Sequence, residues 1–114
     1  MKLYGIPNCD TVKKARVWLD SQGAAYQFHD FKKQGLDTAL LNTWVAQVGW
    51  QKLVNKQGTT WRKLDPTRQA VVVDAPSAIE LMLEYPSLIK RPVLVREGKM
   101  AVGFDVDAYT ALIS

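Results

Sequence analysis

The sequence predicts an α/β protein, and three observations lead to that prediction. The chain from Lys2 to Phe31 has the order strand, helix, strand, which is typical of a βαβ unit. The middle of the chain has helical periodicity, and the C-terminal part combines a hairpin pattern with a final helix. At 114 residues, 47% of them hydrophobic, the chain is long enough for one domain with one core.

The first predicted strand covers Lys2–Ile6 and stops at Pro7, because proline cannot donate a hydrogen bond to a sheet. A helix signal follows at once, and we expect Asn8 or Asp10 to be its N-terminal cap. Its apolar residues recur on one face: Val12, Ala15 and Leu19. The helix is expected to end at Ser21–Gly23.

The second predicted strand is Tyr26–Phe31, where apolar and polar residues alternate. A helix with Asp37 as its cap and Gly49 as its stop follows. Its apolar stripe, which we assign to the core, consists of Leu36, Leu40, Leu41, Trp44, Val45 and Val48. The segment Asn55–Arg62 is predicted to be a loop.

Two further helices are expected, one within Pro66–Val73 and one that begins after Asp74 and is closed by Pro86. The strands Pro92–Arg96 and Met100–Gly103 flank Glu97-Gly98-Lys99 and predict a hairpin. A final helix is expected over residues 105–113, with Asp105 and Asp107 as caps.

Composition excludes several classes of protein. The 23% of charged residues is globular usage, unlike that of a disordered or low-complexity segment. No apolar run approaches the ~18 residues of a membrane span, and the N-terminus lacks a secretory signal. One cysteine and one histidine exclude an internal disulfide and a Cys/His zinc site. We therefore expect a cytoplasmic protein with no metal and no membrane contact.

The net charge of +4 is modest, and the basic residues are spread over several segments. Nucleic-acid-binding modules usually concentrate such charge on one face or helix. An anionic small molecule or peptide suits this charge as well as a nucleic acid does, and we expect no direct nucleic-acid partner. No periodic pattern indicates a dimer seam, so the expected state is a monomer.

Cys9 is the first candidate for chemistry, because it lies between a strand end and a helix start. Free backbone N–H groups and the helix dipole favour an anion there, which lowers a thiol pKa and makes the reactive thiolate. Asn8 beside it, Lys13 one turn later and Arg16 further along are expected to favour the thiolate. The alternative is a buried, inert cysteine, against which the polar neighbours Asn8 and Asp10 argue.

The single thiol restricts the mechanism. The second cysteine of a Cys-x-x-Cys pair would stand at position 12, which is Val12. No intramolecular thiol is available to resolve an adduct, so a catalytic cycle needs an external thiol such as glutathione. The expected intermediate is a mixed disulfide between Cys9 and that thiol.

Two other segments are candidates for binding. Pro92 opens a strand, and if its peptide bond with Arg91 is cis, backbone groups beside it could face the thiol; otherwise Arg91 is a surface charge. In Gly58-Thr59-Thr60-Trp61-Arg62, hydroxyl and guanidinium groups are suited to a carboxylate, and the alternative is a connector with a buried tryptophan. His29 has no nearby partner in sequence and is assigned to strand packing rather than catalysis.

Three separated motifs resemble the ArsC/Spx family, and its YffB branch most closely: Tyr4–Arg16, Gly58–Leu64 and Ile89–Pro92. The match covers the whole chain. It implies a thioredoxin-like fold (βαβ…ββα) in a single domain, 1–114, with a central helical insertion at about residues 36–88. It also implies that Cys9 is the catalytic thiol, that Pro92 is a cis-proline beside it, and that Arg91 contacts the anionic substrate or the glutathione adduct.

The sequence departs from the family's glutaredoxin-coupled arsenate reductases at four places. Gly5 stands where they carry a histidine, and Lys13 where they carry an arginine. A further family arginine falls near Gly103, and another near Gln57, where Arg62 is the nearest guanidinium. Fewer arginines complement a compact oxyanion poorly, which disfavours arsenate reduction.

The function that the sequence predicts is a glutathione-dependent thiol–disulfide reductase with one nucleophilic cysteine. Arg91 and Arg62 are expected to bind glutathione carboxylates, while Thr59, Thr60 and the Pro92 backbone hold its peptide part. One alternative is an Spx-like regulator that binds the RNA polymerase α subunit, although Val12 removes the usual redox switch of that branch. The other alternative is a glutaredoxin-coupled arsenate reductase.

Overall fold

Four strands of four residues each form one mixed sheet in the computed structural model, which describes residues 1–114. The strands are β1 (Lys2–Gly5), β2 (Gln27–Asp30), β3 (Val93–Arg96) and β4 (Lys99–Val102). Their order in the sheet is β2-β1-β3-β4, with β1 parallel to β2 and antiparallel to β3. The predicted βαβ unit and the predicted hairpin are both confirmed.

The chain falls into two compact units. The first consists of Met1–Gly35 and Arg91–Ser114, and it holds the sheet with helices α1 (Asp10–Ser21), α2 (Phe31–Gln34) and α8 (Val106–Ile113). The second, Leu36–Lys90, is helical. None of the helices in either unit combines the length and apolar composition needed to cross a membrane.

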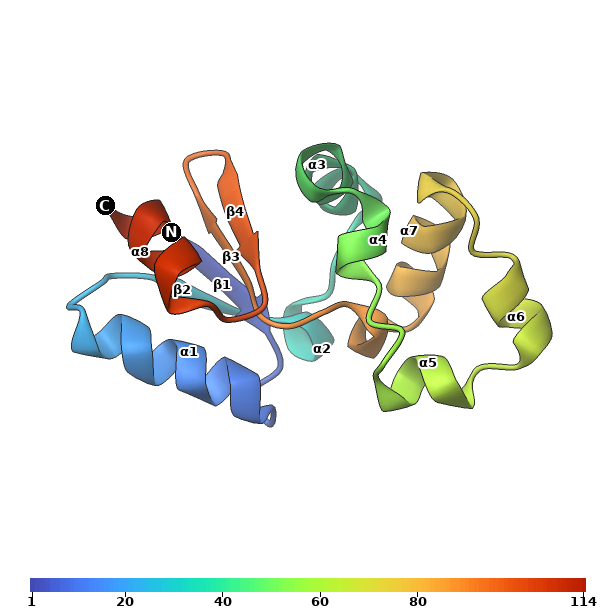
Figure 1. Cartoon of the computed structure of the whole chain (residues 1–114), viewed down its shortest axis with the longest axis horizontal. Helices are drawn as coiled ribbons and strands as arrows, with labels where there is room; N and C mark the ends of the chain where they lie inside the picture. The colour runs from blue at the N-terminus through green and yellow to red at the C-terminus, as the bar shows by residue number, and fades with distance from the viewer. The chain divides into compact units, whose positions relative to one another are not determined.

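Helices α1 and α8 pack on the same face of the sheet (Figure 1). Leu3 of β1 and Leu94 of β3 contribute to this core, and their side chains are fully buried. Ala15 and Leu19 come from the predicted apolar face of α1, and Tyr109 comes from α8. The helical periodicity of the sequence therefore identifies the core face of α1.

Local signals explain most ends of the elements, and every strand differs from its predicted bounds by one residue at one or both ends. Cys9, in an extended conformation, is the N-terminal cap of α1, so the expectation of Asn8 or Asp10 was wrong. The second strand ends at Asp30, because its carboxylate accepts a hydrogen bond from Lys32 N–H and starts α2. Asp105 caps α8 as predicted, whereas Asp107 does not cap and donates its backbone N–H to Asp105.

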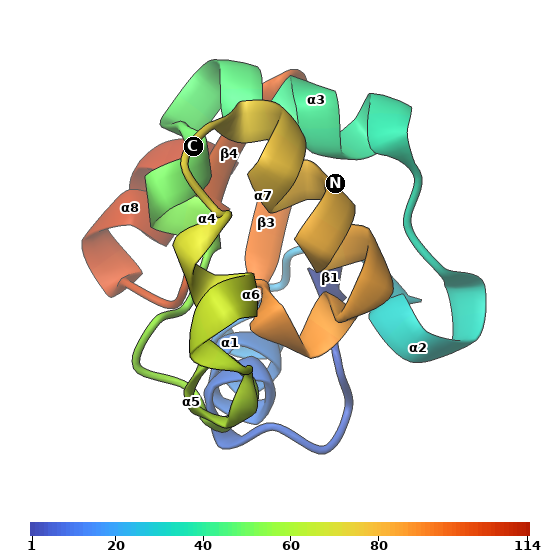
Figure 2. The same cartoon turned by 90° about the vertical axis from the view of Figure 1, so that its right-hand side faces the viewer.

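The helical unit contains α3 (Thr38–Val48), α4 (Trp50–Leu53), α5 (Thr59–Lys63), α6 (Pro66–Ala70), α7 (Ala75–Glu84) and the 3₁₀ turn Pro86–Leu88. Figure 2 views it with α5, α6 and α7 toward the reader. The predicted caps are confirmed, because Asp37 accepts from Leu40 N–H and Asp74 forms a capping box with Ser77. The stripe of α3 is only partly core: its buried members are Leu41 and Trp44. The prediction of a loop through Arg62 was wrong, since residues 59–63 form α5.

Tyr109 supplies a specific test of the first unit. Its hydroxyl is buried and donates a hydrogen bond of 2.7 Å to the carbonyl of Gly103, and burial raises the pKa of Tyr109, which keeps it a neutral donor. Tyr109→Phe leaves that carbonyl without this donor and is expected to lower the free energy of unfolding by about 1–2 kcal/mol, measured by urea denaturation. Tyr26→Phe, at a half-buried hydroxyl that accepts from Arg16, is the control and should cost less. Equal losses would contradict this role for Tyr109.

Candidate functional site

The sequence places Cys9 at the junction between β1 and α1. Its backbone is extended, with φ −135° and ψ 126°, and its carbonyl accepts the first hydrogen bond of the helix from Lys13 N–H at 2.9 Å. The side chain makes no capping hydrogen bond and is partly exposed. The thiol therefore lies at the positive end of the α1 dipole and is within reach of solvent, as its position in the sequence predicted.

The surroundings of Cys9 favour its thiolate. Partial burial raises the pKa of the Cys9 thiol, but the nearby backbone N–H groups of Val12 and Thr11 and a hydrogen bond from the Arg91 side chain lower it. The positive charge of Arg91 lowers it further, and the net result is a pKa below the ordinary value. Because the thiolate is the nucleophilic form, this site is suited to thiol exchange.

Arg91 lies beside the thiol although it is far from Cys9 in the sequence. It is the first residue after the helical unit, and β3 of the same compact unit begins two residues later. The Arg91 guanidinium donates a hydrogen bond to the Cys9 sulfur, a contact that the sequence analysis did not predict. The role that the family resemblance implied, a contact with the anionic substrate or the glutathione adduct, stays a prediction. The peptide bond between Arg91 and Pro92 is cis, as the family resemblance implied.

Pro92 is buried, and its carbonyl is already engaged. It accepts a hydrogen bond of 2.7 Å from the N–H of Gly103, a residue with a positive φ of 82°. A proline has no N–H to offer, so the Pro92 backbone has less hydrogen-bonding capacity for a ligand than expected. Its part in holding glutathione stays a prediction.

The other residues expected beside the thiol lie as follows. Asn8 and Lys13 are exposed, and the part expected of each in stabilising the thiolate stays a prediction. Arg16 does not continue a cationic stripe toward Cys9: its Nε donates to Tyr26 Oη at 3.3 Å and its guanidinium lies 4.3 Å from the centroid of the Phe28 ring. Because Cys9 is extended rather than helical, the spacing that placed it on one face with Arg16 does not apply.

Thr59, Thr60 and Arg62 lie on α5 in the helical unit, where Thr59 and Arg62 are exposed. Their expected role as glutathione-binding residues stays a prediction. A neighbour that the sequence analysis missed is Lys56, whose ammonium lies 5.2 Å from the centroid of the Trp61 ring and 5.9 Å from that of Trp50. These cation–π contacts link Lys56, which precedes α5, to Trp50 of α4 and Trp61 of α5.

Gly5 and Val12 are linked in space. A Cβ atom built on Gly5 would lie 2.9 Å from a methyl group of Val12, whose side chain is fully buried. Any larger residue at position 5 requires Val12 to move. Gly5 therefore packs against Val12 beside the thiol, and Val12 stands where a Cys-x-x-Cys pair has its second cysteine.

His29 lies on β2 and does not contact this site. Its ring lies 4.8 Å from that of Tyr4, and its Nε2 is 2.7 Å from the Gly35 carbonyl oxygen. The assignment to strand packing agrees with these contacts, although the histidine does have a polar partner. No group of three or more His, Cys, Asp or Glu residues that could hold a metal ion is present.

Comparisons with known proteins place these features in a family context. The model of the ArsC family matches residues 4–112. A solved structure described as YFFB protein is 52% identical, covers 99% of this chain and 98% of its own, and superposes with a TM-score of 0.94. An arsenate reductase (ArsC) related protein from Brucella melitensis is 53% identical, with coverages of 96% and 91% and a TM-score of 0.77. The global transcriptional regulator Spx of Streptococcus pyogenes is 25% identical over 98% of this chain and 84% of its own.

Proposed function

Because the chain belongs to the ArsC family, we propose that it is a glutathione-dependent thiol–disulfide reductase in which Cys9 is the only nucleophile. The coarser conclusion, a thioredoxin-like protein of thiol-based redox chemistry, follows from the family and from its solved relatives. The observation that carries the finer proposal is the Cys9–Arg91 pair. The thiol is partly exposed at a helix N-terminus, and the Arg91 guanidinium donates a hydrogen bond to its sulfur.

The proposed reaction has two thiol exchanges. The Cys9 thiolate attacks the glutathione sulfur of a mixed disulfide, the S–S bond breaks, and the substrate sulfur leaves as a thiolate that takes a proton from water. The thiolate of a second glutathione then attacks the Cys9 adduct, which releases oxidised glutathione and restores Cys9. In sum, the mixed disulfide and one glutathione give the free substrate thiol and oxidised glutathione.

The charges around the thiol suit glutathione, which carries two carboxylates. Arg91 donates to sulfur in the free protein and is positioned to bind an anionic adduct, because guanidinium pairs with carboxylate in a fixed geometry. Lys13 and Asn8 are proposed to stabilise the thiolate, and Thr59, Thr60, Arg62 and the Pro92 backbone to bind the peptide part of glutathione. The protein is proposed to act as a cytoplasmic monomer without a metal.

The test is direct. Treatment with oxidised glutathione is expected to add one glutathione at Cys9, detected by intact mass, and reduced glutathione should remove it. Turnover is measured on the mixed disulfide of glutathione and 2-mercaptoethanol, with glutathione reductase and NADPH as the coupling system. A protein whose thiol was first alkylated serves as the control. Failure of Cys9 to form the adduct would overturn the proposal.

A regulator that binds RNA polymerase is the second candidate, favoured by the similarity to Spx. In that case the protein captures the polymerase α subunit, and Cys9→Ser leaves capture unchanged. Arsenate reduction is less favoured, because the position of the histidine found in those enzymes is Gly5, whose Cβ space is taken by Val12. Arsenite production with glutathione and glutaredoxin would restore that alternative.

A further inference from the structure

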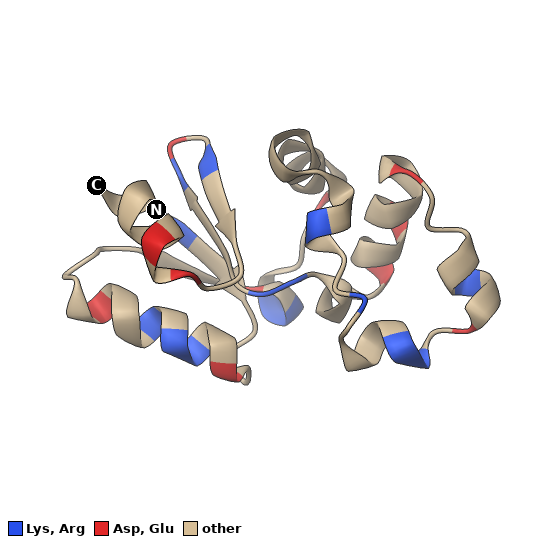
Figure 3. Cartoon of the chain, viewed as in Figure 1, with Lys and Arg blue, Asp and Glu red and all other residues tan.

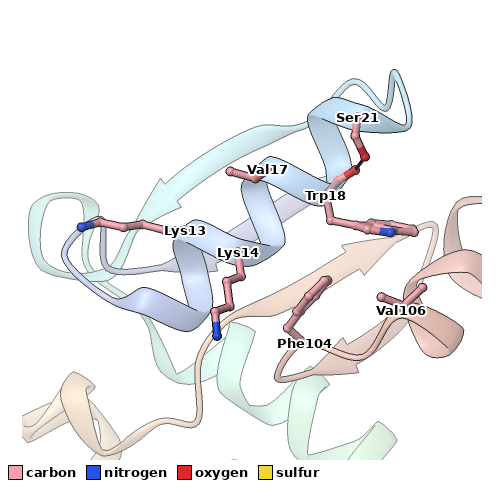
Figure 4. Close-up of a pocket in the computed structure, with 7 residues that line it drawn as sticks. All are labelled: Lys13, Lys14, Val17, Trp18, Ser21, Phe104 and Val106. Carbon is pink, nitrogen blue, oxygen red and sulfur yellow. Dashed lines mark hydrogen bonds between the residues drawn. The ribbon is translucent and has the colours of Figure 1, made fainter.

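A groove of about 470 Å³ runs along the exposed side of α1 in the first compact unit (Figure 4). It lies between α1 and the segment that enters α8, and its lining residues are Lys13, Lys14, Val17, Trp18, Ser21, Phe104 and Val106. Its volume is within the range of sites that bind small molecules or side chains. Apart from Lys13, which is proposed to stabilise the Cys9 thiolate, no residue of the groove has a role in the proposed reductase mechanism.

The walls of the groove are apolar and fixed. Val17 and Val106, which line the groove, are 69% and 45% exposed, so they leave apolar surface open to solvent. Figure 4 shows Trp18, Phe104 and Val106 together on one side of α1. The centroids of the Trp18 and Phe104 rings lie 6.3 Å apart, and the two rings are tilted against each other. Both rings also pack edge-on against the buried ring of Tyr109, which holds the apolar surface in place without a ligand.

The charged side chains that line the groove are basic, and Figure 3 shows basic residues along the middle of α1 with acidic residues at both of its ends. Lys13 and Lys14 line the end nearer Cys9, and no acidic residue lines the groove. Asp105 and Asp107 flank Val106 at the other end. An occupant with a carboxylate is therefore oriented, with its acidic group toward the lysines and its apolar group against Trp18 and Val106.

The groove begins on the N-terminal part of α1, the helix that starts directly after Cys9. Within α1, with 1.5 Å of rise per residue, Trp18 lies about 6 Å along the helix axis beyond Lys14. Extended polypeptide advances roughly 3.3–3.6 Å per residue, so Lys14 and Trp18 match two side chains of a substrate that are two residues apart.

We propose that this groove docks the polypeptide of a glutathionylated protein substrate, with an acidic residue on Lys13 and Lys14 and a bulky apolar side chain on Trp18, Phe104 and Val106. This inference rests on the proposed reductase function and deepens it, because it names the class of substrate. The chemistry is the exchange already described: Cys9 takes the glutathione, and the peptide cysteine leaves as a free thiol.

The probe is the peptide Cys-Gly-Glu-Gly-Leu with glutathione on its cysteine, compared with Cys-Gly-Gln-Gly-Ser. The wild-type kcat/KM is expected to be at least about fivefold higher for the first peptide. Lys14→Glu and Val106→Ser should each remove this preference and leave turnover of the 2-mercaptoethanol disulfide unchanged. Lys99→Glu, an equal change of charge on β4, is the control. When the Glu of the peptide is replaced by Lys, the Lys14→Glu protein should turn over this peptide efficiently again.

Equal rates on the two peptides, or a parallel loss on the small disulfide, would overturn the docking proposal. A failure of the reductase function is recognised separately, since it abolishes turnover of every disulfide. In that case docking is measured by NMR on Cys9→Ser with the peptide Ser-Gly-Glu-Gly-Leu. Shifts of the Trp18 indole signal that Lys14→Glu abolishes support the groove, and unchanged shifts contradict it.

Discussion

Cys9→Ser is expected to lower turnover of glutathione mixed disulfides by more than about a thousandfold. Serine has the same shape, but its hydroxyl does not ionise near neutral pH and forms no disulfide. No second cysteine in the chain can replace it. The measurement is kcat/KM in the coupled glutathione assay, together with intact mass after oxidised glutathione, where the variant should gain no adduct.

The stability of this variant makes the prediction sharper. Cys9 is the N-terminal cap of α1 and makes no side-chain capping bond, whereas serine is among the best capping residues. Cys9→Ser should therefore fold with equal or higher stability, by up to about 1 kcal/mol, in urea denaturation. Cys9→Ala, which cannot cap, is the matched control and should be equally inactive. Retained turnover in a folded Cys9→Ser protein would contradict the mechanism.

Arg91→Met is expected to raise the pKa of Cys9 by about one unit or more, because it removes both a hydrogen bond and a positive charge from the sulfur. The pKa is measured from the pH dependence of alkylation by iodoacetamide. A lowered pKa in the wild type means that thiolate persists as the pH falls. The variant should thus react about tenfold more slowly at pH values below both pKa values, and equally fast above both.

Two further variants separate the charge of Arg91 from its shape and from its neighbours. Arg91→Lys keeps the charge, and the pKa of Cys9 should rise less than in Arg91→Met. Lys13→Gln measures how much the charge of Lys13 contributes to lowering the pKa of Cys9. Arg91→Met should also raise the KM for glutathione if the guanidinium binds its carboxylate. An alkylation profile of Arg91→Met identical to that of the wild type would show that the guanidinium does not control the thiol.

Elements with strong local signals could be predicted from the sequence. The apolar spacing of Val12, Ala15 and Leu19 identified α1, and capping aspartates identified the starts of α3 and α7. The short helix α5 lacked such signals, because five residues make less than two turns and two of them are β-branched threonines. The end of β2 was misplaced because alternation continued through Phe31, while the capping carboxylate of Asp30 ended the strand.

The candidate site also combines features that the sequence could predict with features that it could not. The position of Cys9 between strand and helix is local information, and it sufficed to predict a partly exposed thiol of lowered pKa. The contact with Arg91 joins residues that are far apart in the chain, and it depends on the pairing of β1 with β3. No local pattern encodes such a contact. The family resemblance implied only that Arg91 contacts the anionic substrate or the glutathione adduct, so its contact with the thiol was not predicted. The packing of Val12 against Gly5 was likewise invisible without coordinates.

The separation of Cys9 and Arg91 along the chain has a consequence during protein synthesis. Strand β1 and helix α1 leave the ribosome early, whereas β3 follows the entire helical unit. The guanidinium reaches the sulfur only after a loop of about eighty residues has closed, a slow step compared with forming local helices. The thiol of a nascent chain therefore lacks the contribution of Arg91, and the pKa of Cys9 falls to its final value only after β3 has paired with β1.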